Sequence, residues 1–369
     1  MKIAMIGHKR IPTREGGVEI VVEQLATRLN ELGHEIHIYN RKSKNDITYI
    51  KNKNRLIKKG IRIKEIFTFS HRSLNAIVYT ILATIHALFG KYDIIHFHAE
   101  GPCSMIWLPH LFKIKTVATI HGLDWQRSKW GSFATKYIKF GEKMAVKYAD
   151  EIIVLSKNMQ NYFKKEYNRS TTFIPNGVNI PKKISVNKIE KKWGLEKNSY
   201  ILFLARLVPE KGLHYLIEAY KHIKTDIKLV IAGASSHTDE YVKTIKESIK
   251  NEKRIIMTGF VQGIELEELF SNCLIYCLPS DVEGMPISLL EAMSYECNCL
   301  VSDIEENTQV LNNYGMTFKK GNIKDLENKL KKMLNNKKDL NSNIKKYIQE
   351  NYNWDIIVKE TELLYKKLY

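Results

Sequence analysis

Two carboxylates flank a turn and a short apolar segment in the last third of the chain. Residues 283–293 read E-G-M-P-I-S-L-L-E-A-M, with Glu283 at the turn and Glu291 eight positions later. A glycine turn leaves backbone N–H groups uncrowded, and a helix that follows it directs its positive end to the same place. Because ionised carboxylates only accept hydrogen bonds, this spacing predicts contacts with hydroxyls at two points of one polyhydroxylated ligand. A capped amphipathic helix with two solvated glutamates is the alternative interpretation.

Two cations occupy a loop upstream of these carboxylates. Residues 200–205 form a continuous apolar run that predicts a buried parallel strand, and Arg206 and Lys211 follow it directly, in R-L-V-P-E-K-G. Only 11 of the 58 basic residues are Arg, and after residue 170 only Arg206 and Arg254 remain. Since the planar guanidinium matches phosphate and a helix start favours anions, this loop predicts a diphosphate site. A solvated loop with incidental charges is the alternative.

The N-terminal half offers a glycine pair and a histidine. Gly16 and Gly17 precede a helical pattern that starts at Val18, and they permit close approach of a phosphate to the backbone. The dinucleotide fingerprint G-x-G-x-x-G is absent there, which argues against an NAD or FAD enzyme. His121 ends the apolar run 115–120, where its imidazole could hydrogen-bond a sugar hydroxyl or serve as a structural hydrogen-bonding group.

Strands alternate with helices along the chain, and 369 residues are too many for one ordinary domain. This alternation predicts two doubly wound α/β domains, with ligands beyond the carboxyl ends of the strands in a cleft between the domains. We place the domains at 1–176 and 177–352, followed by a C-terminal helix within 353–369. The polar stretch from Pro175-Asn176-Gly177 to about residue 198 is interpreted as the connection. Strands are expected at 2–6, 35–39, 93–98, 115–120, 151–155, 171–174, 200–205, 228–232, 254–258, 274–278 and 299–302.

The formal charge of +18 is concentrated in one segment. Nine basic residues lie between Lys42 and Lys64 against one acid, Asp46, and the apolar segment 74–89 follows. A basic segment beside a semi-exposed apolar one suits the anionic cytoplasmic leaflet of a membrane. Nucleic acid is the rival polyanion, but no helix-turn-helix, zinc or aromatic RNA-binding motif accompanies the charge, so we expect no nucleic-acid partner. A general Lys bias of the chain is the third interpretation.

The opening segment, the apolar segments and the cysteines together predict the cellular compartment of the protein. The opening apolar run 2–6 is too short for a signal peptide, and segment 74–89 is polar-interrupted and shorter than a bilayer span. Five cysteines, an odd number, indicate a reducing cytosol. We therefore expect a cytoplasmic protein that is peripheral on the inner face of the cell membrane. Four cysteines could be imagined as a zinc set, but their apolar strands predict buried core residues: Cys273, Cys277, Cys297 and Cys299.

The motifs together resemble glycosyltransferase family 4, retaining enzymes of GT-B fold, over nearly the full length of the chain. The motifs that support this resemblance are E-x7-E starting at Glu283, R-x4-K-G starting at Arg206 and the glycine loop at Gly16. The stretches 11–19 and 121–131 resemble more narrowly bacterial capsule and exopolysaccharide enzymes, including rhamnosyltransferase-like members. The resemblance implies two Rossmann-like domains facing each other across a cleft. The first would be the acceptor-side domain and the second the nucleotide-sugar domain, with the C-terminal helix returning to the first.

The same resemblance assigns roles to residues. It implies that Arg206 and Lys211 bind the donor diphosphate, that Glu283 meets the donor sugar and that Glu291 meets the ribose. The loop of Gly16 and Gly17 would close on the β-phosphate. The remaining donor contacts are implied for His121, which would meet the sugar, for Gly284 and Met285 beside Glu283, and for the loop of Gly259, Phe260 and Val261, which would meet the base.

One departure from the family pattern lies beside Glu283. Met285 and Pro286 replace the usual aromatic residue and second glycine, so position 286 has no N–H to offer a sugar hydroxyl. Asp281-Val282-Glu283 also resembles an acidic metal motif of the other glycosyltransferase fold. Because Arg206 and Lys211 can neutralise the diphosphate, we assign Glu283 to the sugar and expect neither a metal nor another cofactor.

The function that this interpretation predicts is transfer of a hexose from a nucleoside-diphosphate sugar to a lipid-linked saccharide during synthesis of a surface polysaccharide. A nucleotide-sugar 2-epimerase of the same architecture is the alternative enzyme, although elimination would require acids and bases in the cleft. A non-enzymatic polyanion-binding or membrane-binding protein is the third class, and it leaves both motifs unexplained.

Overall fold

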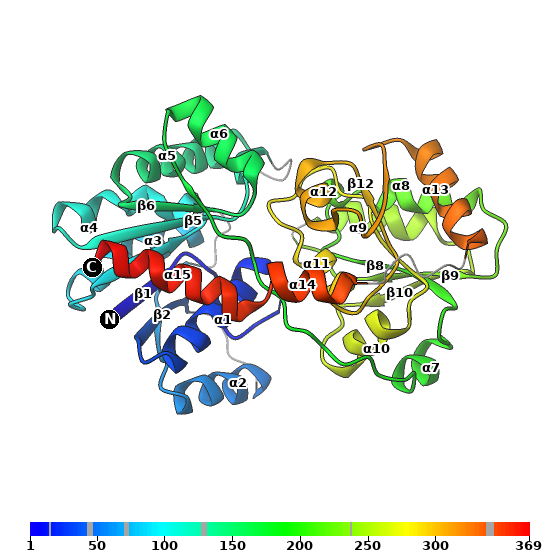
Figure 1. Cartoon of the computed structure of the whole chain (residues 1–369), viewed down its shortest axis with the longest axis horizontal. Coiled ribbons are helices and arrows are strands. Elements are labelled where there is room, and N and C mark those ends of the chain that lie inside the picture. Colours follow the sequence, from blue (N-terminus) through cyan, green and yellow to red (C-terminus); the bar gives the residue numbers. More distant parts are fainter. Residues whose placement is uncertain (15, 43–46, 70–73, 127–130, 237, 337–342) are drawn as a thin grey trace. The chain divides into compact units, whose positions relative to one another are not determined.

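The computed structural model describes residues 1–14, 16–42, 47–69, 74–126, 131–236, 238–336 and 343–369. It divides into two compact units, Met1–Gly177 with Trp354–Tyr369, and Val178–Asn353. Each unit is a parallel β-sheet with helices on both faces (Figure 1). The predicted α/β class with two doubly wound domains is therefore confirmed. None of the described helices has the length and apolarity that crossing a membrane would require.

The sheet of the first unit has the order β3-β2-β1-β4-β5-β6-β7. Its central strands are apolar runs because helices cover both faces. The strands are β1 (Lys2–Ile6), β2 (Glu35–Arg41), β3 (Arg62–Ile66), β4 (Ile94–His98), β5 (Lys115–Ile120), β6 (Glu151–Val154) and β7 (Thr172–Phe173). The helices are α1 (Gly17–Glu31), α2 (Ile47–Lys58), α3 (Leu74–Leu88), α4 (Trp107–Leu111), α5 (Ser132–Tyr148) and α6 (Lys157–Tyr167), with 3-10 turns η1 (Gly101–Met105) and η2 (Asp124–Gln126).

The sheet of the second unit has the order β10-β9-β8-β11-β12-β13. Its strands are β8 (Tyr200–Leu204), β9 (Lys228–Ala232), β10 (Ile255–Gly259), β11 (Ile275–Leu278), β12 (Cys299–Ser302) and β13 (Gly315–Phe318). Its helices are α7 (Lys188–Trp193), α8 (Leu213–Lys221), α9 (Asp239–Ser248), α10 (Ile264–Asn272), α11 (Ile287–Ser294), α12 (Glu305–Leu311), α13 (Ile323–Asn335) and α14 (Ile344–Asn351), with the 3-10 turn η3 (Pro209–Lys211). The four cysteines considered above are buried and free of disulfides.

The C-terminal helix α15 (Trp354–Leu368) belongs to the first unit, where it packs along α1. Buried Tyr365 places its hydroxyl 2.6 Å from Nδ1 of His96 in β4. His34 places Nε2 3.0 Å from Oε1 of Glu362, so polar contacts as well as apolar ones hold the helix.

The polar stretch after residue 177, interpreted from its composition as the connection, packs against the second unit. Its helix α7 packs against α10, and Ile189 and Leu195 are fully buried. Oε2 of Glu268 accepts hydrogen bonds from the backbone N–H groups of Asn187 and Ile189, both at 3.0 Å. These contacts make the stretch part of the second unit.

Each sheet has one point where the strand order reverses, between β1 and β4 in the first unit and between β8 and β11 in the second. Helices leave adjacent strands toward opposite faces at such a point, so a crevice opens beyond the carboxyl ends of the two strands. The loops after β1, β4, β8 and β11 are therefore the places at which the fold favours a ligand.

Candidate active site

Lys211 and Glu283 meet at the reversal point of the second sheet. Lys211 ends η3 in the loop after β8, and Glu283 lies in the loop after β11. Nζ of Lys211 donates to Oε1 of Glu283 at 2.5 Å, and Ser280 Oγ donates to the same oxygen at 2.7 Å. The two side chains are only 13% and 7% exposed. The structure thus joins one residue from each of the two motifs that the sequence presents separately.

A close approach of the two loops makes this pairing possible. Gly212 has φ +66°, and a Cβ there would lie 2.0 Å from the carbonyl oxygen of Pro279. Only glycine therefore allows the loop after β8 to lie against the loop after β11. Across the same junction, the N–H of Asp281 donates to the carbonyl oxygen of Glu210 at 2.9 Å. Tyr215 Oη donates to Oδ2 of Asp281 at 3.2 Å, which gives this carboxylate a protein partner.

A series of buried hydrogen bonds leads from Ser280, which contacts Glu283, to two more polar side chains. Ser302, at the end of β12, donates its hydroxyl to the carbonyl oxygen of Ser280 at 2.5 Å. Asn307 Nδ2 in turn donates to Ser302 Oγ at 2.9 Å. Sequence reasoning missed these three residues. The available signal was a small polar residue at the end of each of two adjacent apolar strands.

The other predicted donor residues lie along the same edge of this sheet. Arg206 lies two residues after the end of β8, and Gly259 ends β10, two strands away. Glu291 lies inside α11, which begins at Ile287 after Pro286 as the sequence predicts. The remaining positions are Phe260, which is 48% exposed, Val261, which is buried, and the buried pair Gly284 and Met285.

Tyr276 links the two glutamates of the E-x7-E motif. Its ring is fully buried, and its hydroxyl donates to Ser288 Oγ at 2.8 Å. Burial raises the pKa of Tyr276 well above its usual value, and the charges of Glu283 and Glu291 add to this effect. Both carboxylates therefore lie within electrostatic range of one buried phenol, which stays protonated.

In the first unit, His121 follows β5 and contacts a histidine at the end of β4. Its Nε2 lies 3.1 Å from Nδ1 of His98. Burial, followed by the neighbouring imidazoles, lowers the pKa of His98 well below its usual value, so this ring is neutral. The Nε2 of His98 is buried and has no hydrogen-bond partner in the described structure. Because a buried orphan acceptor is less unfavourable than a buried orphan N–H, we assign the proton to Nδ1 of His98, which then donates to His121.

The glycine pair Gly16 and Gly17 lies in the loop after β1, where α1 begins at Gly17. A Cβ on Gly16 would lie 2.2 Å from Oε2 of Glu19, whose Oε1 accepts the N–H of Lys9 at 2.9 Å. The glycine pair and the two histidines thus follow β1, β4 and β5, around the reversal point of the first sheet. Residue 15 and residues 127–130 of the resembling stretches lie outside the described residues.

Two buried glutamates anchor the loop that follows His121. Glu100 and Glu142 both have no exposed surface. Oε2 of Glu100 accepts the N–H of Asp124 at 2.8 Å, and Oε2 of Glu142 accepts the indole N–H of Trp125 at 3.2 Å. Oε1 of Glu142 accepts the hydroxyl of Tyr162 at 2.9 Å and that of Tyr167.

Burial affects the charge of Glu100. Burial, then the charges of Asp124 and Glu142, raise the pKa of Glu100 well above its ordinary value of 4.5, so Glu100 is protonated at neutral pH. Its Oε1 is buried and has no hydrogen-bond partner among the described residues, which a neutral acid tolerates better than a carboxylate. Sequence reasoning missed this pair, because Glu100 and Glu142 lie on separate elements.

Two family models together span most of the chain. The model described as Glycosyltransferase Family 4 matches residues 15–181, and the model described as Glycosyl transferases group 1 matches residues 185–351. The chain belongs to the family 4 glycosyltransferases. The predicted enzyme class is confirmed by these matches.

Curated relatives of this glycosyltransferase share about a quarter of its sequence. An uncharacterized glycosyltransferase of Methanocaldococcus jannaschii, MJ1607, is 26% identical, and the match covers 99% of this chain and 98% of that protein. The UDP-Gal:alpha-D-GlcNAc-diphosphoundecaprenol alpha-1,3-galactosyltransferase of Escherichia coli is 30% identical over 60% of this chain and 61% of its own. The capsular polysaccharide biosynthesis glycosyltransferase CapM of Staphylococcus aureus is 23% identical over 68% of this chain and 69% of its own.

Solved structures confirm the GT-B fold. Anabaena HepE in complex with UDP and glucose matches with a TM-score of 0.82 at 18% identity, over 100% of both chains. WaaG, a glycosyltransferase involved in lipopolysaccharide biosynthesis, matches with a TM-score of 0.76 at 13% identity, over 98% of this chain and 99% of its own. At these identities the similarity concerns the fold alone.

The glutamate pair of the first unit generates a prediction about pH. The Glu100→Gln variant should keep its activity, because the amide oxygen can accept the N–H of Asp124 as the protonated acid does. Above pH 4.5 the folded state holds a proton that the unfolded state has lost, so the free energy of unfolding falls as pH rises toward the raised pKa. Glu100→Gln should therefore flatten the fall of Tm between about pH 5 and pH 8.

Glu142→Gln is the matched comparison. It replaces a carboxylate oxygen with an NH2 group that cannot accept from Trp125, Tyr162 or Tyr167, so we expect a lower Tm at every pH and lower activity. Scanning calorimetry across pH and initial-rate assays would measure both effects. Equal losses of Tm and rate in the two variants would contradict a protonated Glu100.

Proposed function

We propose that this glycosyltransferase is a retaining, metal-independent enzyme that moves a sugar from a nucleoside-diphosphate donor to a lipid-linked saccharide in surface polysaccharide synthesis. The observation that carries the proposal is the Lys211–Glu283 pair at the reversal point of the second sheet. Relatives support the acceptor class. The Escherichia coli galactosyltransferase and a Campylobacter jejuni N-acetylgalactosaminyltransferase are both named for diphosphoundecaprenol-linked acceptors, and CapM is named for capsular polysaccharide.

The chemistry requires stabilisation of the departing diphosphate. Lys211 and Arg206 supply positive charge in the loop after β8, and the N-terminus of α8 adds the positive end of a helix. As the donor arrives, its phosphate oxygens compete with Glu283 for Lys211. The carboxylate that Lys211 releases can then accept hydroxyl groups of the donor sugar. The acceptor hydroxyl attacks the anomeric carbon from the side of the leaving group, and an oxygen of the diphosphate takes its proton.

The first unit contributes groups that the family resemblance places near the donor. We propose that the Gly16–Gly17 loop meets the β-phosphate and that His121 meets the sugar. The tautomer assigned above leaves the His121 proton on Nδ1, so that this nitrogen is a hydrogen-bond donor. A 6-deoxy donor sugar would change the contact at its 6-position, and the role of His121 would change with it.

Two carboxylates beside the site could in principle hold a metal, and both have protein partners. Oδ2 of Asp281 accepts from Tyr215, and Oε1 of Glu283 accepts from Lys211 and Ser280. The cations Arg206 and Lys211 provide the charge that a divalent metal would otherwise bring to a diphosphate. We therefore propose a reaction without metal or other cofactor.

A panel of nucleotide sugars, with and without an undecaprenyl-diphosphate-linked acceptor, tests the function as a whole. The proposal expects release of nucleoside diphosphate that depends on the acceptor, and a glycosidic product with the anomeric configuration of the donor by NMR. A changed sugar on an intact nucleotide would instead establish the 2-epimerase alternative. The family models and the named relatives are all of glycosyltransferases and give no support to that alternative.

Loss of either cation should impair the chemical step. We expect Arg206→Ala and Lys211→Ala each to lower kcat by roughly 100-fold or more, because each removes charge that stabilises the leaving group. Steady-state kinetics with the preferred donor would measure the effect. Lys197→Ala, at an exposed lysine of the same unit, is the control and should retain full activity. Near-normal turnover in both test variants, with Tm unchanged, would remove the diphosphate assignment.

Substitutions of Glu283 and Glu291 should affect the binding of different parts of the donor. Glu291→Gln should weaken binding of bare nucleoside diphosphate, because its proposed partner is the ribose. Glu283→Gln should reduce sugar transfer while bare nucleoside diphosphate binds as well as before or more tightly, since Lys211 loses its carboxylate competitor. Isothermal titration with the diphosphate and rate assays with the full donor would measure each role. Equal weakening of diphosphate binding in both variants would disprove the division between sugar and ribose.

Chelation should leave most of the activity in place. Because two cations of the chain face the proposed diphosphate site, treatment with EDTA is expected to change the rate of transfer by less than about twofold. The measurement compares initial rates before and after chelation, and after restoration with magnesium or manganese. A rate abolished by EDTA and recovered with either metal would identify Asp281 and Glu283 as ligands instead.

A further inference from the structure

Helix α3 of the first unit is apolar on both of its faces. Its inner face buries Tyr79, Ala83 and Ala87 against the sheet. On the outer side Leu82 and Ile85 are 39% and 41% exposed. Leu74 at the start of the helix is 47% exposed, and Phe89 just beyond its end is 83% exposed. A helix on the surface of a water-soluble domain normally presents polar residues outward, so this face has the composition of a covered one.

Helices α4 and α5 continue the apolar face. Helix α4 contacts both α3 and α5, and the rings of His110 and Tyr148 join α4 to α5 at 5.5 Å. On α4 and just after it, Leu111 and Phe112 are 68% and 61% exposed. On α5, Phe133 is 65% exposed, and Phe140, two turns later, is 47% exposed. We name the exposed sides of these three helices, with the residues that directly follow α3 and α4, the α3–α5 surface.

The charge of the α3–α5 surface has one sign. Among the described residues from 74 to 149, four are acidic, and none of them is exposed. Two are the buried pair Glu100 and Glu142, Asp93 accepts the backbone N–H of Lys2, and Asp124 lies in η2. Lys115 pairs with Asp150, one residue beyond this range, at 3.3 Å. Every lysine in the range is exposed: Lys91, Lys113, Lys115, Lys136, Lys139, Lys143 and Lys147.

We propose that the α3–α5 surface docks this enzyme on an anionic lipid bilayer. Apolar side chains at a bilayer interface leave water, and neighbouring lysines extend their charged ends to the lipid phosphates. A second copy of the chain fits less well. A two-fold interface through this surface would face lysines with lysines and would offer no exposed acid from it to pair with them. Docking would bring the enzyme to the lipid-linked acceptor of the proposed function, but it can be tested without donor or acceptor.

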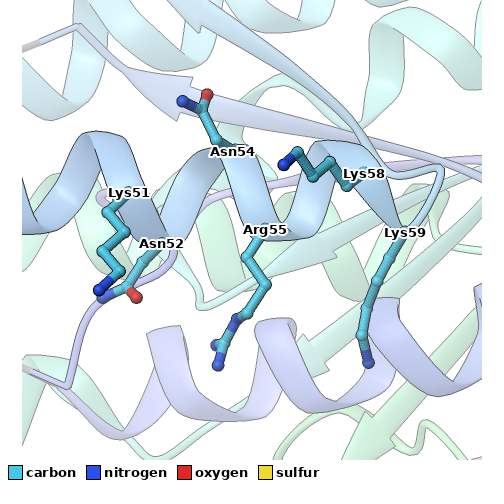
Figure 2. Close-up of a pocket in the computed structure, with 6 residues that line it drawn as sticks. All are labelled: Lys51, Asn52, Asn54, Arg55, Lys58 and Lys59. Atoms are coloured by element: carbon cyan, nitrogen blue, oxygen red, sulfur yellow. The ribbon is translucent and has the colours of Figure 1, made fainter.

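The basic segment 42–64, which the sequence favours for this role, carries less free charge than its composition indicates. Three cations on or directly after α2 have acidic partners in the same unit. Lys53 is 2.6 Å from Glu65, and Lys59 is 3.2 Å from Glu31. Arg55 is 3.5 Å from Glu23. Arg55 and Lys59 line a hollow together with Lys51, Lys58 and two asparagines, Asn52 and Asn54 (Figure 2). The α2 region therefore serves as a matched control for the α3–α5 surface.

The test measures co-sedimentation of the full chain with vesicles. One vesicle contains phosphatidylglycerol in phosphatidylcholine, and the other contains phosphatidylcholine alone. Wild-type protein should bind the anionic vesicles, retain part of that binding at high salt through its apolar contacts, and bind the neutral vesicles weakly. The variant with Phe89→Ser, Phe112→Ser and Phe133→Ser should lose at least about tenfold in binding, as should the variant with Lys113→Gln, Lys136→Gln and Lys143→Gln. The control with Lys51→Gln and Lys58→Gln should lose much less.

Two further measurements separate docking from misfolding and from self-association. All three variants replace exposed residues, so their Tm and their donor hydrolysis should match wild type. Trp107, which is 37% exposed on α4, should shift its fluorescence to shorter wavelength on anionic vesicles, and Trp107→Phe should abolish that shift. Larger loss in the α2 control than in the α3–α5 variants would overturn the proposal. So would equal binding to neutral and anionic vesicles, or a dimer in sedimentation velocity that the phenylalanine variant dissolves.

Discussion

The contact between the loops after β8 and β11 is the constraint on which the second unit's site depends. Gly212 lets one loop reach the carbonyl of Pro279 in the other, and this approach brings Lys211 to Glu283. A part-buried cation and carboxylate each need a partner, because an isolated charge removed from water is costly. In the free protein the two side chains satisfy each other. Under the proposed function, a diphosphate sugar would replace both partners at once, phosphate for the lysine and hydroxyls for the glutamate, so the ion pair would hold the two groups in place for the same ligand.

The first unit meets the same architectural problem with neutral groups. Its reversal point lies between β1 and β4, where a Cβ on Gly7 would lie 2.1 Å from the carbonyl oxygen of His98. Burial keeps His98 uncharged, and the protonated Glu100 contributes no charge beside Glu142. The two units therefore present different electrostatics from one topology. An ion pair lies at the reversal point of the second sheet, and a neutral histidine lies at that of the first.

The sequence predicted the elements whose signal is local and missed those whose signal is not. Central strands such as β1, β5 and β9 were placed to the residue, since burial on both faces makes them continuous apolar runs. The edge strands β3 and β13 were missed, because a strand with one neighbour and partial exposure mixes polar and apolar residues. Site residues were chosen motif by motif, yet their partnerships depend on strand order. Lys211 and Glu283 are 72 positions apart and meet only because β8 and β11 are neighbours.

Helix α3 shows how the same limit applies to surfaces. Its apolar sequence predicts a helix but does not say which side meets the core, and only the packed structure leaves Leu82, Ile85 and Phe89 outside. The helices of a parallel sheet begin at the carboxyl edge of the strand before them, so α3 and α5 start at the edge that carries the Gly16 loop and His121, whereas Phe89 and Phe112 precede β4 and β5 and lie toward the opposite edge. An acceptor whose lipid tail stays in the bilayer can reach that edge only if the enzyme lies close to the membrane. A face of lysines and aromatic residues on these helices would provide that closeness without a membrane-spanning segment.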